Sequence, residues 1–158
     1  MLNTIDHIVI TVEDLPSAIE DYSKVLGLKP TWRGEHPEMG TENVLFPLQN
    51  TYLELIAAKG NGLYADIVKA NLDNKGEGLF GLVLGTNNLE VFKKTLTEKG
   101  IETGDIIEGK GFEPKLNITR TWKNLFLDPS TTRDLFVFPI EHISGKLPLA
   151  KEDKSQAS

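Results

Sequence analysis

The order of hydrophobic and polar positions near the start of the chain predicts a strand. Residues 5–12 read IDHIVITV, are rich in β-branched residues and are bounded by turn-forming residues. Because successive side chains of a strand point to opposite faces, Ile8, Ile10 and Val12 form an apolar face. His7 lies on the other, less apolar face of this predicted strand.

A helix and three further strands follow along the chain. The helix is predicted over an apolar stripe from Leu15 to Leu26, with Asp14 as its cap and Gly27 as its stop. Three strands are then expected, over residues 29–33, 43–48 and 51–57. The first part of the chain therefore has the order strand, helix, three strands.

The second part of the chain repeats this order of elements. When LFGLVLGTNNL is set against IDHIVITVEDL, Leu89 falls on Leu15, and Gly100 lies close to the position of Gly27. The repeat period is about 74 residues, which is typical of two copies of a half-domain and too long for a solenoid. A helix begins near Leu89, and the expected strands cover residues 79–84, 105–107, 116–127 and 135–140.

The repeat predicts one domain, residues 1–144, in which a connector with a short helix over residues 63–72 joins two modules. Each module alone is too small to bury enough surface for a stable separate domain. The expected division is module one 1–58, connector 59–77, module two 78–144 and a polar C-terminal tail 145–158.

Length and composition are those of a soluble globular protein. The 158 residues are 39% hydrophobic and 25% charged. With 17 basic and 23 acidic residues the net charge is −6 and no basic stripe is visible, which disfavours nucleic acid and anionic membrane surfaces as partners. The N-terminal segment lacks a basic leader region, and its apolar run is too short to span a bilayer, so we expect a cytoplasmic protein.

The chain has no cysteine, which excludes disulfides, thiolate zinc sites and a cysteine nucleophile. A metal ion would have to be held by histidine, aspartate or glutamate. Only three histidines exist, namely His7, His36 and His142. His142 follows the last predicted strand, and we expect it to be exposed.

The opening segment IDHIVITVEDLPSAIEDYSKVLGL resembles the first strand and helix of the vicinal oxygen chelate (VOC) superfamily. This superfamily includes glyoxalase I, extradiol dioxygenases, methylmalonyl-CoA epimerase and fosfomycin- or bleomycin-resistance proteins. TYLELIA resembles its fourth strand, and residues 36–57 are closer still to the sub-group called glyoxalase-like domains. The resemblance covers residues 1–142. It implies an α+β fold in which two tandem βαβββ modules form a curved mixed sheet around a shared cleft.

The resemblance also implies a divalent metal in the cleft, held by ligands from the first and fourth strands of each module. Its first-module ligands match His7 and Glu54, which suit Zn, Ni, Mn, Co or Fe(II). The second module departs from the pattern, because the equivalent positions hold Gly81 and Phe136, or a residue within one of it. A third ligand, His36, is available if its loop, flanked by proline and glycine, folds back over the cleft.

His7 and Glu54 also form a candidate catalytic pair without a metal. A carboxylate between Leu53 and Leu55 on an inward-facing strand is costly to bury without a partner, and His7 is the natural partner. Such a pair raises the pKa of the histidine and offers acid–base capacity.

Several further residues are candidates for substrate binding. Arg120 and Trp122 alternate on one face of a late strand, where the sub-group often has these residue types, and they suit an anionic ligand and its stacking. The pattern does not decide whether that face is the inner one. The other candidates are His36, Asn43, Tyr52 and Phe136, for which an exposed position or plain packing is the alternative.

Two functions remain open on the sequence alone. The first is a metal-dependent lyase, isomerase or dioxygenase that acts on a small oxygenated compound, in which His7 and Glu54 hold the metal. The second is a metal-free binding or resistance-type protein that sequesters a small, partly aromatic molecule in the same cleft. Relatives often dimerise, so a homodimer is one expected assembly.

Overall fold

The computed structural model describes residues 1–133 and 135–145. The first half contains β1 (Leu2–Thr11), α1 (Leu15–Leu26), β2 (Trp32–His36), β3 (Thr41–Pro47) and β4 (Tyr52–Ala58). The connector contains α2 (Leu63–Lys75). The second half contains β5 (Gly78–Thr86), α3 (Leu89–Glu98), β6 (Thr103–Glu113), β7 (Ile118–Leu127), the short 3₁₀ helix η1 (Pro129–Thr132) and β8 (Phe136–Ser144). The predicted polar tail lies, except for Gly145, outside the described residues.

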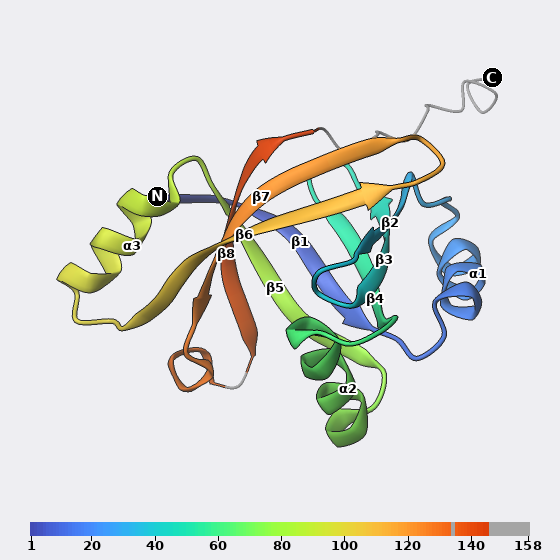
Figure 1. The fold of residues 1–158 in the computed structure, drawn as a ribbon, viewed down its shortest axis with the longest axis horizontal. Coiled ribbons are helices and arrows are strands. Elements are labelled where there is room, and N and C mark those ends of the chain that lie inside the picture. The colour runs from blue at the N-terminus through green and yellow to red at the C-terminus, as the bar shows by residue number, and fades with distance from the viewer. Residues whose placement is uncertain (134, 146–158) are drawn as a thin grey trace.

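The strands form one closed barrel in the order β1-β4-β3-β2-β6-β7-β8-β5 (Figure 1). The two halves meet twice, where β1 pairs antiparallel with β5 and where β2 pairs antiparallel with β6. Within the halves, β1 runs parallel to β4 and β5 runs parallel to β8. The predicted α+β fold of two βαβββ modules in a curved mixed sheet is therefore confirmed.

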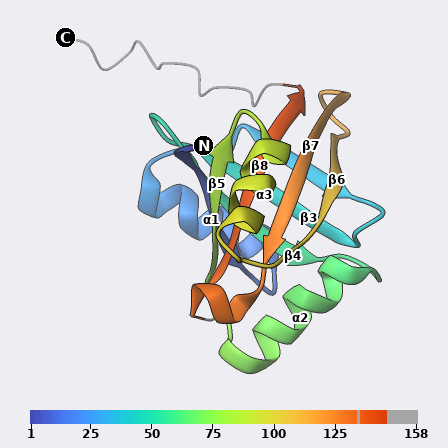
Figure 2. The same ribbon diagram turned by 90° about the vertical axis from the view of Figure 1, so that its left-hand side faces the viewer.

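The helices lie outside the strands, and their ends follow the sequence signals. The Asp14 side chain accepts from the Ser17 backbone N–H at the start of α1, and Gly27 ends this helix with φ +64°. Asn88 caps α3, which packs against β6, β7 and β8 (Figure 2). Among the described residues, none of the helices is long and apolar enough to cross a membrane.

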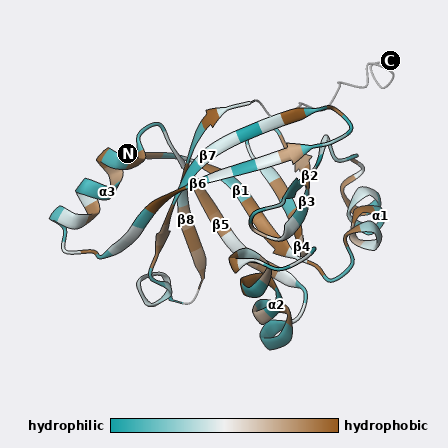
Figure 3. Ribbon diagram, in the orientation of Figure 1, coloured by the Kyte–Doolittle hydropathy of each residue, from teal (hydrophilic) through white to brown (hydrophobic). Residues whose placement is uncertain are grey.

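The two faces of β1 are buried in different places. Ile10 and Val12 belong to a cluster between the barrel wall and α1. Val9 belongs to a second cluster inside the barrel, together with Phe138 and other residues of β5 and β8. Figure 3 shows β5 and β8 as largely hydrophobic strands and the helices as carriers of hydrophilic residues. The less apolar face of β1, which includes His7, is the one that faces the barrel interior.

β6 is longer than the sequence predicts, because two glycines expected in a loop belong to the strand. The strand runs from Thr103 to Glu113 instead of over residues 105–107. A Cβ at Gly109 would lie 2.2 Å from Trp122 Nε1, and one at Gly111 would lie 3.1 Å from the same indole. These glycines therefore make room for the Trp122 side chain on the inner wall, where any larger residue would collide with it.

Candidate functional site

The barrel interior holds a cavity that both halves line. Its empty space, counted together with the open solvent at its mouth, amounts to about 770 Å³. Most of the lining is aliphatic or aromatic. Its polar side chains come from six strands and from α2, and they are His7, His36, Asn43, Tyr52, Glu54, Tyr64, Arg120, Asn124 and His142.

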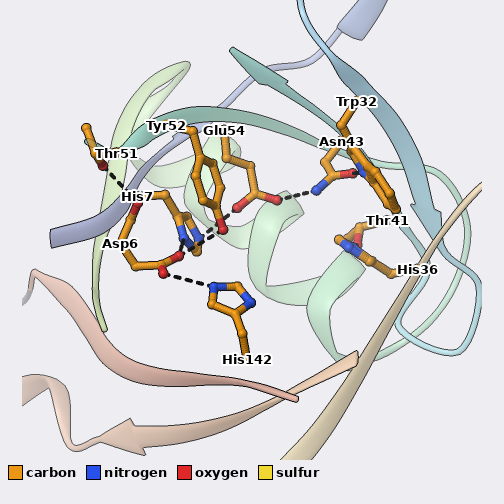
Figure 4. A network of polar contacts seen from close by, with 10 residues as sticks. All are labelled: Asp6, His7, Trp32, His36, Thr41, Asn43, Thr51, Tyr52, Glu54 and His142. Atoms are coloured by element: carbon orange, nitrogen blue, oxygen red, sulfur yellow. Dashed lines mark hydrogen bonds and ion pairs between the residues drawn. The ribbon is translucent and has the colours of Figure 1, made fainter. Parts of the chain in front are cut away.

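A bulge in β1 brings Asp6 and His7 together. The pairing of β1 with β5 shifts between Ile5 and His7, so that Asp6 is an extra residue in β1. His7 Nδ1 lies 2.7 Å from Asp6 Oδ1 (Figure 4). In a regular strand the two side chains would point to opposite faces.

His7 also contacts Glu54, a residue of the neighbouring parallel strand β4. His7 Nε2 lies 3.1 Å from Glu54 Oε2, and both side chains are buried. Each ring nitrogen of His7 thus faces a carboxylate oxygen, and an ionised carboxylate only accepts hydrogen bonds. The arrangement favours the imidazolium form of His7, because only that form donates from both nitrogens.

The polar network continues from Glu54 into β3 and β2. Asn43 Nδ2 donates to Glu54 Oε1 at 2.6 Å, and Trp32 Nε1 donates to Asn43 Oδ1 at 3.1 Å. Both oxygens of the Glu54 carboxylate are therefore oriented by neighbouring side chains. The structure adds Asn43, which the sequence singled out separately, to the predicted pair of His7 and Glu54.

Asp6 also contacts Tyr52 and His142. The Tyr52 hydroxyl donates to Asp6 Oδ1 at 2.9 Å, and its ring stacks on His7 with a centroid distance of 4.6 Å. His142 Nε2 lies 2.8 Å from Asp6 Oδ2. The His142 side chain is 34% exposed and lines the cavity, so it lies at the mouth. It is exposed as the sequence predicts, but it is tied to Asp6.

The charges of this network shift the pKa values of its members. Burial acts to raise the pKa of Asp6, but hydrogen bonds with His142 and His7 hold it well below its usual range. Burial acts to lower the pKa of His7, and the hydrogen bonds and charges of Asp6 and Glu54 raise it overall. Burial acts to raise the pKa of Glu54, and the contact with His7 lowers it overall. The network is therefore a set of ionised groups inside an apolar cavity.

The structure corrects the position of His36. The sequence predicts His36 in a loop before the third strand, but it is the last residue of β2 and is buried. Its Nδ1 lies 2.9 Å from Thr41 Oγ1, and its ring meets Trp122 edge-on at 5.6 Å between centroids. Burial lowers the pKa of His36, so this ring favours the neutral form. The strand continues past its predicted end because Gly34 and Glu35 pair with Asn43 and Glu42 of β3.

Arg120 is a buried cation on the inner face of β7. It is 6% exposed, and its guanidinium carbon lies 5.4 Å from the ring centroid of Trp32 and 5.8 Å from that of Tyr52. Trp122 and Asn124 line the same cavity. The face of β7 that carries these residues is therefore the inner one, which the sequence did not decide. Phe136, at the start of β8, also lines the cavity.

The strand register identifies the second-half positions that correspond to His7 and Glu54. β1 and β5 pair symmetrically, with His7 opposite Val83 and Val9 opposite Gly81, so Gly81 corresponds to His7 as predicted. Val9 pairs with Glu54, and Val83 pairs with Phe138. Phe138, and not Phe136, therefore corresponds to Glu54. The prediction placed this position two residues too early because the sequence does not show where β8 begins.

The donors present do not fit the metal site that the resemblance implies. In residues 1–133 and 135–145, no three histidine, aspartate or glutamate side chains are placed to hold a metal ion, so the predicted set of His7, Glu54 and His36 is not assembled. A Cβ at Gly81 would lie 2.6 Å from the Phe136 carbonyl oxygen, which leaves no room for a ligand side chain there. Phe138 has no ligand atom.

Sequence reasoning missed four polar residues, namely Asp6 of the hydrogen-bond network and three that line the cavity. Asp6 was missed because a bulge reverses its face, and no local sequence signal marks that bulge. Asn124 carries a weak signal, since it follows Arg120 and Trp122 at a spacing of two. Tyr64 comes from the connector helix, and His142 was assigned to the surface only.

Comparisons with known proteins agree with this fold. A family model described as "Glyoxalase-like domain" matches residues 5–157. No curated protein sequence matches the chain.

Three solved structures illustrate the similarity. A variant of Streptomyces coelicolor methylmalonyl-CoA epimerase in complex with 2-nitronate-propionyl-CoA has a TM-score of 0.74 and 18% identity, and the match covers 94% of this chain and 100% of that one. Methylmalonyl-CoA epimerase from Mycobacterium tuberculosis has a TM-score of 0.73 and 20% identity, with 90% of each chain covered. A hypothetical protein from Bacillus halodurans has a TM-score of 0.72 and 18% identity, with 90% and 96% covered. At these identities the similarity shows the fold. The chain belongs to the glyoxalase-like domain family and has the VOC fold.

Proposed function

We propose that the chain is an isomerase or lyase that moves a proton on a carbon atom next to a carbonyl group of a small oxygenated molecule. The observation that supports this function most directly is the His7–Glu54 pair. It places an ionised carboxylate and an imidazolium 3.1 Å apart inside an apolar cavity. A base and an acid side by side are what proton abstraction next to a carbonyl requires.

In the proposed reaction Glu54 takes the proton from carbon, and His7 donates its Nε2 proton to the enolate oxygen. Asp6 keeps the Nδ1 proton in place, so His7 remains oriented when it becomes neutral. Glu54 then gives the proton to the neighbouring carbon of the enediol, and the hydroxyl on the carbon that lost the proton returns a proton to His7 as it becomes the new carbonyl, which restores both groups. The net result is an isomerisation with no change in protonation of the protein.

A metal-dependent form of this function has less support. His7 and Glu54 would supply two ligands, but the second-half positions hold Gly81 and Phe138. The proposed proton transfers therefore use the side chains of Glu54 and His7 alone.

The second candidate function is binding without chemistry, as in a sequestration protein. It is supported by the aromatic wall that replaces the second-half ligands. Phe126 lies 5.6 Å from Phe136 and 5.0 Å from Phe138, between ring centroids, and all three line or pack against the cavity cluster. Such a wall holds a flat molecule without reacting with it.

Hydrogen exchange separates the two candidates. The purified protein is incubated in D₂O with a panel of 2-oxo acids, hydroxyaldehydes and α-branched acyl thioesters, and loss of the proton next to the carbonyl is followed by NMR. Methylmalonyl-CoA, which a solved relative binds, belongs in the panel. We expect Glu54→Gln and His7→Gln each to reduce exchange by about 100-fold or more.

The matched control is Glu35→Gln, which changes a partly exposed carboxylate that pairs with Lys59. It should leave exchange unchanged. A panel member that binds to the wild-type protein without exchange would favour sequestration. Exchange that survives in Glu54→Gln would contradict the proposed base.

Cytoplasmic location and a homodimer stay proposals that rest on the sequence. Size-exclusion chromatography with light scattering tests the homodimer directly.

A further inference from the structure

Three polar atoms inside the cavity have no partner in the described part of the chain. Four buried side-chain nitrogen or oxygen atoms of the described residues lack a hydrogen bond, and three of them belong to Arg120, Asn124 and Tyr64. These three residues all line the cavity. Because buried polar groups are almost always hydrogen-bonded, unpaired atoms gathered around one cavity indicate what its occupant must offer.

The two strand residues among them have opposite requirements. Arg120 Nε is a donor on a cation, and Arg120 forms no ion pair with any residue that the structure describes. Asp6 and Glu54, the acidic side chains nearest the cavity, are already bound to histidines. Asn124 Oδ1 is an acceptor and is buried. Arg120 therefore requires an anion, and Asn124 requires an N–H or O–H donor.

The two residues also lie at opposite ends of one strand face. Arg120, Trp122 and Asn124 alternate along β7, so the α-carbons of the outer two are about 13 Å apart at the usual rise of a strand. The flat indole of Trp122 lies between them. The Arg120 guanidinium is held over the rings of Trp32 and Tyr52, which limits where it can reach.

Tyr64 lies near Asn124 in the cavity. Burial raises the pKa of Tyr64 to about 12, and the nearby amide of Asn124 acts against this rise. The phenol is thus protonated at neutral pH. Its oxygen lies within reach of the Asn124 amide, but neither the Tyr64 hydroxyl nor Asn124 Oδ1 has a hydrogen bond of good geometry. A ligand group that both donates and accepts would satisfy Asn124 and Tyr64 together.

We infer that the cavity takes an aryl carboxylate with a hydroxyl or amino group at its far end. The carboxylate binds Arg120, the aromatic ring lies against Trp122 and the phenylalanine wall, and the far group donates to Asn124 and accepts from Tyr64. This assignment rests on the proposed function, in which the cavity holds a small oxygenated molecule, and it names the class of that molecule.

Tryptophan fluorescence reports binding in this cavity, because both tryptophans of the chain line it. The probe is 3-(4-hydroxyphenyl)propanoate. Two matched compounds each remove one feature: 3-(4-hydroxyphenyl)propanamide lacks the charge, and 3-phenylpropanoate lacks the donor. We expect the amide, which lacks the charge, to bind about 10- to 100-fold more weakly than the probe. 3-Phenylpropanoate, which lacks the donor, should bind several-fold more weakly than the probe.

The variants assign these preferences to residues. Arg120→Met should erase the preference for the acid over the amide, and Asn124→Leu should erase the preference for the hydroxyl. Arg33→Met, which removes an exposed arginine from the outer side of β2, is the matched control and should bind like the wild type. Arg120→Lys keeps the charge and should retain part of the acid preference, which guards against a variant that merely fails to fold.

The outcomes separate this inference from the proposed function. Equal binding of acid and amide to the wild type, or an acid preference that survives in Arg120→Met, would overturn the ligand assignment and leave the exchange result untouched. Normal probe selectivity without any exchange would overturn the proposed reaction only.

Discussion

His142 Nε2 lies 2.8 Å from Asp6 Oδ2, although 136 positions separate the two residues in the sequence. The contact joins β8 to β1. The Asp6 carboxylate thus contacts two histidines and a tyrosine, namely His7, His142 and Tyr52. Asp6 therefore favours the charged form of His7 and also holds the side chain of His142 at the mouth of the cavity.

Replacing this carboxylate should change the protonation of His7. In Asp6→Asn we expect the pKa of His7 to fall, because a charged hydrogen-bond acceptor becomes neutral while burial stays the same. The buried hydrogen-bond loss should cost about 1–3 kcal/mol of stability. NMR titration resolves this shift, since the chain has only three histidines. Asp105→Asn, at a fully exposed side chain, is the control, and an unchanged His7 titration in Asp6→Asn would contradict the assignment.

The same network predicts how stability depends on pH. Asp6 and Glu54 have lowered pKa values in the folded protein, so their contribution is present above the unfolded carboxyl pKa of about 4 and is lost as the pH falls. The pKa of His7 is raised, so its contribution is complete below about pH 6.5 and is lost as the pH rises through the folded value. Stability should therefore be greatest between about pH 4 and 6.5 as far as these groups decide it.

Thermal unfolding from pH 3 to 9 measures this dependence. The double variant His7→Gln/Glu54→Gln should have a flatter profile than the wild type, because it removes two of the three groups considered above and leaves only Asp6 of them. A profile with unchanged slopes in the double variant would show that other residues control the pH dependence.

A single methyl group at Gly109 should disturb the cavity wall. Its Cβ would lie 2.2 Å from Trp122 Nε1, so Gly109→Ala must displace the indole, at a cost of about 1–3 kcal/mol for overpacking. The fluorescence of the protein should change along with its melting temperature. Gly104→Ala in the same strand is the control, since its Cβ would lie an ordinary 3.7 Å from the Phe126 carbonyl oxygen, and it should melt like the wild type.

Metal content is a further test of the site. Protein purified without a tag, and then incubated with Mn, Ni, Zn or Fe(II) and desalted, should hold much less than one equivalent of metal by elemental analysis. The reason is that only His7 and Glu54 of the four first- and fourth-strand ligand positions carry donors, and that His36 is not placed to complete a set with them. Stoichiometric metal that disappears in Glu54→Ala would instead restore the metal-dependent reaction.

The sequence predicts the elements better than it predicts the cavity. Alternation placed His7 and Glu54 on the faces that prove to be the inner ones, because Ile8, Ile10 and Val12 mark the opposite face of one strand and Leu53 and Leu55 mark that of the other. The same rule failed at Asp6, where a bulge adds one residue, and at Gly109, where a glycine indicates a large neighbour instead of a turn. Both failures depend on pairing with a distant strand, which local pattern does not contain.

The second-half ligand position shows a different limit. The repeat correctly set Gly81 against His7, but the equivalent of Glu54 depended on where β8 begins, and only the register with β5 identifies Phe138. Likewise, the unpaired atoms of Arg120 and Asn124 are visible only when the surroundings of each side chain are known.

The correspondence of His7 with Gly81 and of Glu54 with Phe138 means that the two halves have the same order of elements but line the cavity with different kinds of side chain. The first half carries the proposed base and acid, Glu54 and His7, and the second half carries most of the aromatic surface together with Arg120. Substitutions in β5 and β8 can therefore reshape what the barrel accepts while the acid and base stay untouched, so that new specificities are accessible by changing one half at a time.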